Sequence, residues 1–230
     1  MSTVYLLIHG FTGNPDNLKT LDDFLTGEGL DTINVRVKGH TNHRRDLRGI
    51  TCYEWIDSVL DVYDNALKTY DDAVVIGYSM GGLIALIIGA VRKPKTVFSV
   101  CSPVFPLSRR NMFKRIVEST KIRSTLPFQD YYGVLRRMPV SAIGNFSRLR
   151  AISKKIFPSV KVPAVVIQTK NDDSSNPKSG RYIYRKIGSA RKYLIEPPYG
   201  YHGVFEADNQ YNADTLELIL RYIKKLDKQS

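Results

Sequence analysis

Cysteine is nearly absent from this chain. Cys52 and Cys101 are the only two among 230 residues, which is too few for a disulfide framework, and they lack the spacing of metal ligands. We interpret both as buried thiols and expect neither a metal site nor a cofactor. Long apolar runs are also missing. The longest, residues 83–91, is far below the roughly 18 residues that a membrane span needs, so we expect no transmembrane segment.

The beginning of the sequence, MSTVYLLIHG, lacks the positively charged region and the apolar run of about 7 to 15 residues that are typical of a secretory signal. We therefore expect a cytoplasmic protein. A length of 230 residues and a hydrophobic content of 43% favour one domain with a full core and room for an inserted subdomain.

Acidic residues are scarce in one part of the chain. Residues 103–157 hold 12 Lys and Arg side chains but only Glu118 and Asp130, whereas the rest of the chain has 22 basic and 20 acidic residues. Such a segment is typical of a solvated helical face, or of a surface for nucleic acids or anionic membranes. No nucleic-acid module or aromatic stacking pattern accompanies the charge, so we expect no nucleic-acid partner.

Six short β-rich runs alternate with helical patterns. The runs cover residues 4–8, 32–37, 73–77, 96–101, 164–169 and 192–196, and the helical patterns cover 16–26, 53–67, 79–91, 176–187 and 213–226. Apolar strands that alternate with helices predict an α/β fold, in which helices cover both faces of a parallel sheet. Because the sequence begins at the first of these runs, we expect a minimal sheet of six strands, all parallel.

The stretch between the fourth and fifth runs interrupts this alternation. It contains short helical patterns, which we expect to be broken at Pro127, Gly133, Pro139 and Gly144. We therefore predict a core made of residues 1–102 and 158–230, with residues 103–157 as a small, basic, inserted cap.

One hydroxyl interrupts the apolar stretch VVIGYSMGGLIALIIGAV at residues 74–91. A G-x-S-x-G pattern between a strand and a helix is typical of a nucleophile elbow, where Gly77 and Gly81 relieve crowding around the sharp turn. Such a turn lifts Ser79 above the sheet, and the N–H groups of the following helix face any negative charge that develops there. The plainer alternative is that Ser79 only caps the helix.

The loops that follow the strands bring an acid and an imidazole to the same edge of the sheet. Of the four histidines, only His202 follows both Ser79 and an acid at a strand end, in the chain order Ser, Asp, His. We expect Asp172 to orient His202, with Asp173 as the alternative. These three residue types together predict a Ser79, His202 and Asp172 triad.

Four motifs resemble those of a known family. HGFTGNP (9–15), KGH (38–40), GYSMGG (77–82) and QTKNDDSSNP (168–177) are similar to motifs of small bacterial carboxylesterases and monoacylglycerol lipases in the α/β-hydrolase superfamily, over residues 4–226. The resemblance implies an α/β-hydrolase fold, an oxyanion hole made by the backbone N–H groups of Phe11 and Met80, and a cap over the active site. The sequence departs from the family at residues 173–175, where an apolar side chain is usual, and at Gly203, where valine is usual.

We therefore predict a serine carboxylic-ester hydrolase that acts on a small-molecule ester or acyl substrate through an acyl-enzyme. The alternatives are a thioesterase or amidase with the same residues, or a non-catalytic module that binds ligands on the same fold. Apolar side chains of the cap are candidates for an acyl pocket or for the cap's own small core: Met112, Phe113, Leu126, Phe128, Tyr131, Tyr132 and Leu135.

Overall fold

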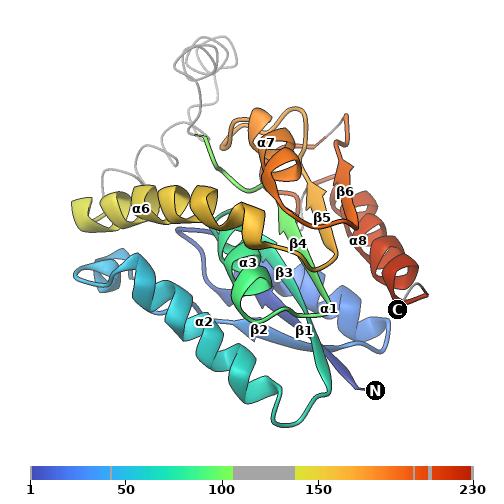
Figure 1. The fold of residues 1–230 in the computed structure, drawn as a ribbon. Helices are drawn as coiled ribbons and strands as arrows, with labels where there is room; N and C mark the ends of the chain where they lie inside the picture. Colours follow the sequence, from blue (N-terminus) through green and yellow to red (C-terminus); the bar gives the residue numbers. More distant parts are fainter. Residues whose placement is uncertain (1, 42, 106–137, 199, 207–208, 229–230) are drawn as a thin grey trace.

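The computed structural model describes residues 2–41, 43–105, 138–198, 200–206 and 209–228. Six strands form its central sheet, in the order β2-β1-β3-β4-β5-β6, and every neighbouring pair is parallel (Figure 1). The prediction of a six-stranded parallel sheet is confirmed. The strands are β1 (Thr3–Ile8), β2 (Asp31–Val35), β3 (Asp72–Tyr78), β4 (Thr96–Val100), β5 (Ala164–Ile167) and β6 (Lys192–Ile195).

Helices connect the strands, and the five predicted helical patterns are all confirmed, the first of them divided between a short 3₁₀ turn and α1. The α-helices are α1 (Lys19–Gly27), α2 (Cys52–Ala66), α3 (Met80–Val91), α6 (Val140–Ile156), α7 (Lys178–Lys186) and α8 (Asn212–Asp227). The 3₁₀ turns are η1 (Pro15–Leu18), η2 (Arg44–Leu47) and η3 (Phe157–Ser159).

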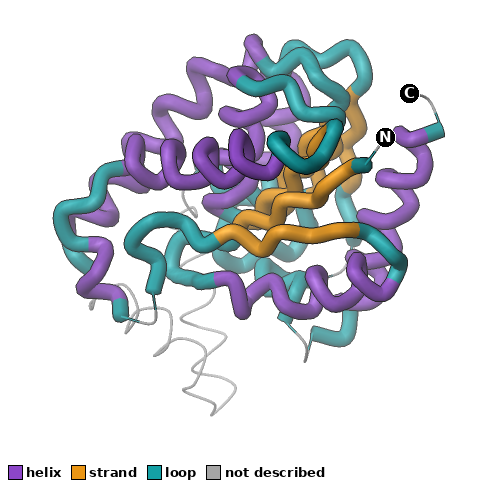
Figure 2. The backbone as a smooth tube through the Cα atoms, turned by 90° about the horizontal axis from the view of Figure 1, so that it is seen from below, coloured by secondary structure: helices purple, strands orange, loops and turns teal. Residues whose placement is uncertain are grey.

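Two hydrophobic cores lie on opposite faces of the sheet, because successive residues of a strand point to opposite sides. In β1, Val4 and Leu6 pack into the core beneath α2, α3, α6 and α7, whereas Tyr5 and Leu7 pack into the core beneath α1 and α8. Figure 2 shows the strands enclosed between these helical layers. Both cysteines, Cys52 and Cys101, are free and buried, as predicted.

Helix α2 illustrates how local sequence sets an element. A capping box at its first turn joins Thr51 to Glu54: the Thr51 hydroxyl accepts the Glu54 N–H, and the Glu54 carboxylate accepts the Thr51 N–H. Trp55, Val59 and Tyr63 follow at a spacing of four residues and are buried in the core. The helix therefore begins at a polar cap and is held to the sheet by one apolar face.

The expected break at Gly144 is wrong, because α6 runs through this glycine without interruption from Val140 to Ile156. A Cβ at Gly144 would meet nothing within 4 Å, so the residue lies on an open side of the helix, where glycine lowers stability by only about 0.5–1 kcal/mol. Ala142 and Leu149 on the other side are buried in the core with α2 and α3. The Asn145 side chain also accepts the Cys52 N–H and donates to the Ile50 carbonyl.

The apolar residues that we considered as candidates for an acyl pocket, from Met112 to Leu135, lie outside the described residues, as do residues 106–137 of the expected cap in general. Among the helices that the structure describes, none is both long and apolar enough to cross a bilayer.

The chain changes the side on which it adds strands at one point, between β1 and β3. From β1 the chain moves to β2 on one side, and then returns to β3 on the other side and continues outward to β6. The loops after β1 and β3 therefore part in opposite directions above neighbouring strands. In open parallel sheets this switch point at the carboxyl ends of the strands is where ligands bind.

Candidate active site

Ser79 occupies the turn between β3 and α3, at the switch point of the sheet. Its φ of 54° and ψ of −117° form a sparsely populated conformation that costs a residue with a side chain about 1–3 kcal/mol. A Cβ at Gly77 would lie 2.2 Å from the Gly81 carbonyl oxygen, and one at Gly81 would lie 2.1 Å from the Ile8 carbonyl oxygen. The turn thus requires glycine on both sides. Ser79 occupies the N-cap position of α3 but makes no capping hydrogen bond, so helix capping does not account for its hydroxyl.

The His202 ring lies between Ser79 and Asp172. Its Nε2 is 3.0 Å from Ser79 Oγ, and its Nδ1 is 3.0 Å from each carboxylate oxygen of Asp172. Because an ionised carboxylate only accepts, Nδ1 carries the proton and Nε2 accepts from the serine hydroxyl. Ser79 and Asp172 are only 7% and 5% exposed. These distances are within reach of direct proton transfer between a hydroxyl and a base.

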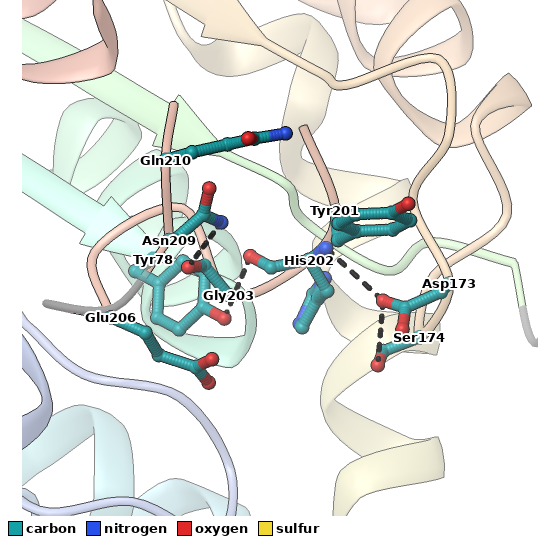
Figure 3. A pocket seen from close by; sticks show the side chains of 9 residues that line it. All are labelled: Tyr78, Asp173, Ser174, Tyr201, His202, Gly203, Glu206, Asn209 and Gln210. Atoms are coloured by element: carbon teal, nitrogen blue, oxygen red, sulfur yellow. Dashed lines mark hydrogen bonds between the residues drawn. The ribbon is translucent and has the colours of Figure 1, made fainter. Parts of the chain in front are cut away.

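Asp173, the alternative acid, contacts the backbone of His202 and not its ring. Its Oδ1 accepts the His202 N–H at 3.1 Å. Figure 3 shows the Asp173 carboxylate on one side of His202 and the Tyr78 ring on the other. The Tyr78 hydroxyl donates to the His202 carbonyl at 2.9 Å, and the two rings lie 5.2 Å apart. The loop that carries the imidazole is therefore held from both sides.

Four donors besides His202 surround the Asp172 carboxylate. Oδ1 accepts the N–H groups of Ser174 and Ser175, at 2.9 and 2.6 Å. Oδ2 accepts the Ser175 hydroxyl at 2.7 Å and the Gln168 side-chain amide at 2.8 Å. Two of these donors are backbone N–H groups, and the Ser175 hydroxyl and the Gln168 amide supply the others, so the buried carboxylate has the hydrogen bonds that it needs.

The electrostatics of this pair favour its charged form. Burial, the largest single effect, would lower the pKa of His202, but the Asp172 carboxylate, Asp173 and Glu206 together outweigh it, so the pKa is raised above its usual value. Burial alone would raise the pKa of Asp172, but His202 and the Ser175 hydrogen bonds lower it. An imidazolium that forms at His202 is thus stabilised by the carboxylate beside it.

The loop after β1 packs directly against the elbow. A Cβ at Gly10 would come within 3.3 Å of Ser79 Cβ, and Phe11 lines the same pocket as Ser79. His9 fixes the loop from inside: its Nε2 accepts the Val37 N–H at 3.2 Å, so Nδ1 carries the proton and donates to the Gly10 carbonyl at 2.9 Å. Met80 follows Ser79 in the chain and is the first residue of α3, so its N–H has no acceptor inside the helix.

His40 packs against the loop after β1, near the rings of His9 and Phe11. Its buried ring packs against the rings of His9 and Trp55, at centroid distances of 5.2 and 5.3 Å. Burial lowers the pKa of His9 to about 3 and that of His40 to about 4, so both imidazoles are neutral in the folded protein.

A pocket of about 410 Å³ opens over Ser79 and His202. Its apolar wall comes from Phe11 and from two residues of α6, Ile143 and Phe146. Phe146 stacks on Phe11, with ring centroids 4.6 Å apart and 9° between the planes. The Arg150 guanidinium lies 5.2 Å from the centroid of the Phe146 ring. Helix α6 therefore builds one side of the site.

Sequence reasoning missed several residues that shape this site, namely Tyr78, Gln168, Ser175, Phe146 and Glu206. Tyr78 and Ser175 stand inside the quoted motifs. Their positions in the sequence place them near the site, but the sequence does not indicate which hydrogen bonds they make. Phe146 comes from a helix that the sequence pattern divides. Nothing in the local sequence of Glu206 distinguishes it from a surface acid.

One set of possible metal ligands occurs among the described residues. Ligand atoms of Cys101, Asp172 and His202 lie within 4.8 Å of one another. Burial raises the pKa of the Cys101 thiol, which disfavours the thiolate that a metal requires. Asp172 and His202 already bind each other, so the three residues fit a hydrogen-bonded pair beside a neutral thiol better than a metal centre.

Two curated proteins are similar to this chain over most of their length. A thermostable monoacylglycerol lipase of Bacillus sp. (strain H-257) is 25% identical over 209 residues, which is 86% of this chain and 81% of that protein. A carboxylesterase of Bacillus subtilis (strain 168) is 23% identical over 197 residues, or 82% of this chain and 80% of that protein.

A solved structure from the metagenome-derived lipolytic enzymes LipS and LipT superposes with a TM-score of 0.78 at 21% identity, covering 97% of this chain and 94% of the other. This similarity concerns the fold. The model of the alpha/beta hydrolase family matches residues 5–213, a range that includes the elbow, the Asp172 loop and the His202 loop. The match spans nearly the whole parallel sheet and its loops, and the chain belongs to the α/β-hydrolase family.

Proposed function

We propose that this protein is a serine carboxylic-ester hydrolase in which Ser79 is the nucleophile, His202 the general base and acid, and Asp172 the group that orients His202. The observation that carries the proposal is the continuous hydrogen-bonded path from Ser79 Oγ through His202 to Asp172, with 3.0 Å at each step. The carboxylesterase and the monoacylglycerol lipase among the relatives support the same class of reaction.

In the first half-reaction, Ser79 Oγ attacks the ester carbonyl carbon while its proton passes to His202 Nε2. The carbonyl oxygen becomes an oxyanion, for which we propose the N–H groups of Phe11 and Met80 as donors. The bond between the carbonyl carbon and the alcohol oxygen then breaks, and His202 returns the proton to that oxygen. The alcohol leaves, and the acyl group stays on Ser79.

In the second half-reaction, water attacks the acyl-enzyme and gives one proton to His202. The bond between the carbonyl carbon and Ser79 Oγ breaks, and the proton returns to Ser79. The carboxylic acid leaves and the starting enzyme is restored. Throughout, Asp172 keeps the proton on Nδ1 of His202 and stabilises the imidazolium.

The apolar wall of Phe11, Ile143 and Phe146 suits the acyl part of the substrate. Because two of these residues belong to α6, we also propose that residues 103–157 act as a cap that sets acyl specificity. The same residues would serve a thioester or an amide, which is the second candidate activity. The cytoplasmic location expected from the N-terminal sequence stays a prediction.

The test compares hydrolysis of p-nitrophenyl esters, from acetate to palmitate, by the wild type, Ser79→Ala and the control Ser159→Ala. Ser159 is an exposed serine in η3, near the start of β5 at the other end of the sheet. We expect Ser79→Ala to lose at least about 1,000-fold of kcat, and Ser159→Ala to retain activity. The chain-length profile of the wild type measures the acyl pocket.

Labelling with a fluorophosphonate separates the alternatives. A folded wild type that modifies at Ser79 but hydrolyses acyl thioesters and no oxygen ester supports the thioesterase alternative. A folded wild type that neither turns over an ester nor takes the label contradicts the proposal and favours a ligand-binding module.

A further inference from the structure

A second cavity adjoins the active-site pocket at the catalytic histidine. It measures about 460 Å³ and shares five lining residues with the pocket over Ser79: Tyr78, Ser174, His202, Gly203 and Glu206. Figure 3 shows it from close by, with Glu206 on one side of the His202 loop and Tyr201 and Asp173 on the other. The two cavities thus adjoin at the His202 loop.

The lining of this second cavity, which we call the alcohol-side cavity, is polar and acidic. Its residues include two carboxylates, Asp173 and Glu206, two side-chain amides, Asn209 and Gln210, and the ring of Tyr201, which is 58% exposed. No lysine or arginine is among the described residues that line it. This composition contrasts with a chain whose formal net charge is +12.

Both carboxylates lie against the histidine loop. Asp173 accepts the His202 N–H, as described above, and the Glu206 carboxyl group lies next to Gly203. A Cβ at Gly203 would lie 2.4 Å from the Glu206 carboxyl group, so a larger residue here would displace this acid from its present position. The small size of Gly203 therefore allows the Glu206 carboxylate to line the cavity.

The reaction fixes which part of a substrate lies beside His202. The alcohol oxygen takes its proton from His202 Nε2, so this oxygen must lie beside Nε2. The rest of the alcohol group therefore begins next to His202. The apolar wall of the active-site pocket suits the acyl part, which leaves the polar space past His202 for the alcohol.

We propose that the alcohol-side cavity binds a positively charged alcohol group, so that the preferred substrates are apolar acyl esters of an alcohol that carries an ammonium group. Asp173 and Glu206 supply the countercharge, and the Tyr201 ring supplies an aromatic face for the cation. This inference rests on the proposed function and specifies the substrate class of the same site.

A matched pair of esters tests the charge alone. Butyrylcholine and 3,3-dimethylbutyl butyrate have the same acyl chain and nearly the same shape, but only the first is positively charged. We expect the ratio of their kcat/KM values to favour the cation by about tenfold at low ionic strength, as partly exposed charges and one aromatic face allow. The preference should shrink in 1 M salt, where charges are screened over about 3 Å.

Two variants locate the effect. Glu206→Gln removes one charge from the cavity and should reduce the ratio to about threefold. Glu217→Gln makes the same change on the exposed side of α8 and should leave the ratio as in the wild type. Using a ratio within each variant removes any general effect of the substitution on catalysis.

The outcomes separate this inference from the proposed function. Hydrolysis of p-nitrophenyl butyrate with equal rates on the matched pair overturns the charged alcohol and leaves the esterase intact, as does a ratio that Glu206→Gln does not change. A wild type that hydrolyses none of the three esters contradicts both the proposed esterase function and the charged alcohol. If p-nitrophenyl butyrate alone is hydrolysed, inhibition by choline is compared with inhibition by 3,3-dimethyl-1-butanol, and equal inhibition likewise overturns the inference.

Discussion

The ring of Phe146 in α6 lies flat against the ring of Phe11 in the loop after β1, with 4.6 Å between the centroids. Phe11 follows the first strand of the chain, whereas Phe146 lies between the fourth and fifth strands. The stack joins α6 to the loop that carries the proposed Phe11 oxyanion donor. A well-packed aromatic pair of this kind adds about 0.5–1.5 kcal/mol beyond its buried area.

Replacing Phe146 by alanine should therefore lower kcat more than it raises KM. Without the stack the Phe11 N–H is held less firmly, and since losing an oxyanion donor costs about 100- to 1,000-fold, partial loss of its position should cost about tenfold in kcat. Steady-state kinetics on p-nitrophenyl butyrate measure the effect. Phe146→Tyr retains the ring and should restore most of the rate.

Ile143→Ala serves as the matched control, because Ile143 lines the same pocket from the same helix. Its loss removes apolar surface from the acyl site and should act mainly on KM. If Phe146→Ala changes KM alone, as Ile143→Ala does, then Phe146 is a wall of the pocket and does not position the oxyanion loop.

Ser175→Ala should reduce kcat/KM by about tenfold. The Ser175 hydroxyl donates to Asp172 Oδ2 at 2.7 Å in a fully buried position, and removing a donor from a buried carboxylate costs about 1–3 kcal/mol. Ser159→Ala, at the other end of the sheet, should change nothing. Kinetics measured well below the melting temperature of each variant separate the two roles: a shift in Tm at constant kcat/KM would mean that Ser175 only stabilises the fold.

The relation between the serine, the acid and the histidine is the part of the site that the sequence predicts best. Ser79, Asp172 and His202 each follow a strand of one parallel sheet, and the carboxyl ends of such strands lie at one edge. Strand order and the elbow motif are enough to bring these loops together. The six strands are predictable for a similar reason, since each is a short buried run between turns.

Contacts between side chains from distant elements are not predictable in this way. The Phe146 stack depends on α6 being one continuous helix, and a glycine at 144 gives the opposite indication locally. Packing against α2 and α3 outweighs that weak preference. Likewise, the position of Glu206 depends on the empty space at Gly203, which only the folded loop reveals.

The acidic limb of the pH profile of kcat/KM should lie above pH 6.5, the ordinary value for histidine, because the folded protein raises the pKa of His202 and only the neutral ring accepts the serine proton. Glu206→Gln should move this limb to lower pH, since one of the carboxylates that stabilise the imidazolium is removed. Glu217→Gln again provides the control. A limb that stays in place in Glu206→Gln would mean that the Glu206 charge does not reach His202.

Folding stability should fall steeply as the pH drops through the acid range, because of two neutral histidines in the β1 loop region. His9 and His40 have folded pKa values of about 3 and about 4, whereas the unfolded chain has 6.5. Between these values the unfolded state binds more protons than the folded state, so stability is lost as the pH falls below 6.5. Two protons correspond to a slope of about 2.7 kcal/mol per pH unit.

His202 has the opposite sign and acts in a different window. Its pKa is raised in the folded protein, so it contributes stability that is fully present below pH 6.5 and is lost as the pH rises through the folded value. Between pH 5 and 6 it is largely protonated in both states, and this range therefore isolates His9 and His40. The lowered pKa of Asp172 acts below about 3.8, outside the same range.

Urea unfolding at several pH values between 5 and 6 measures the slope directly. His40→Gln removes one of the two titrating groups and should halve the slope to about 1.4 kcal/mol per pH unit, even if the variant is less stable throughout. Because natural domains are stable by only about 5–15 kcal/mol, the wild type should approach unfolding near the lower end of the acid range. A slope near zero in the wild type would mean that His9 and His40 take up protons without unfolding, and that the β1 loop opens locally to admit them.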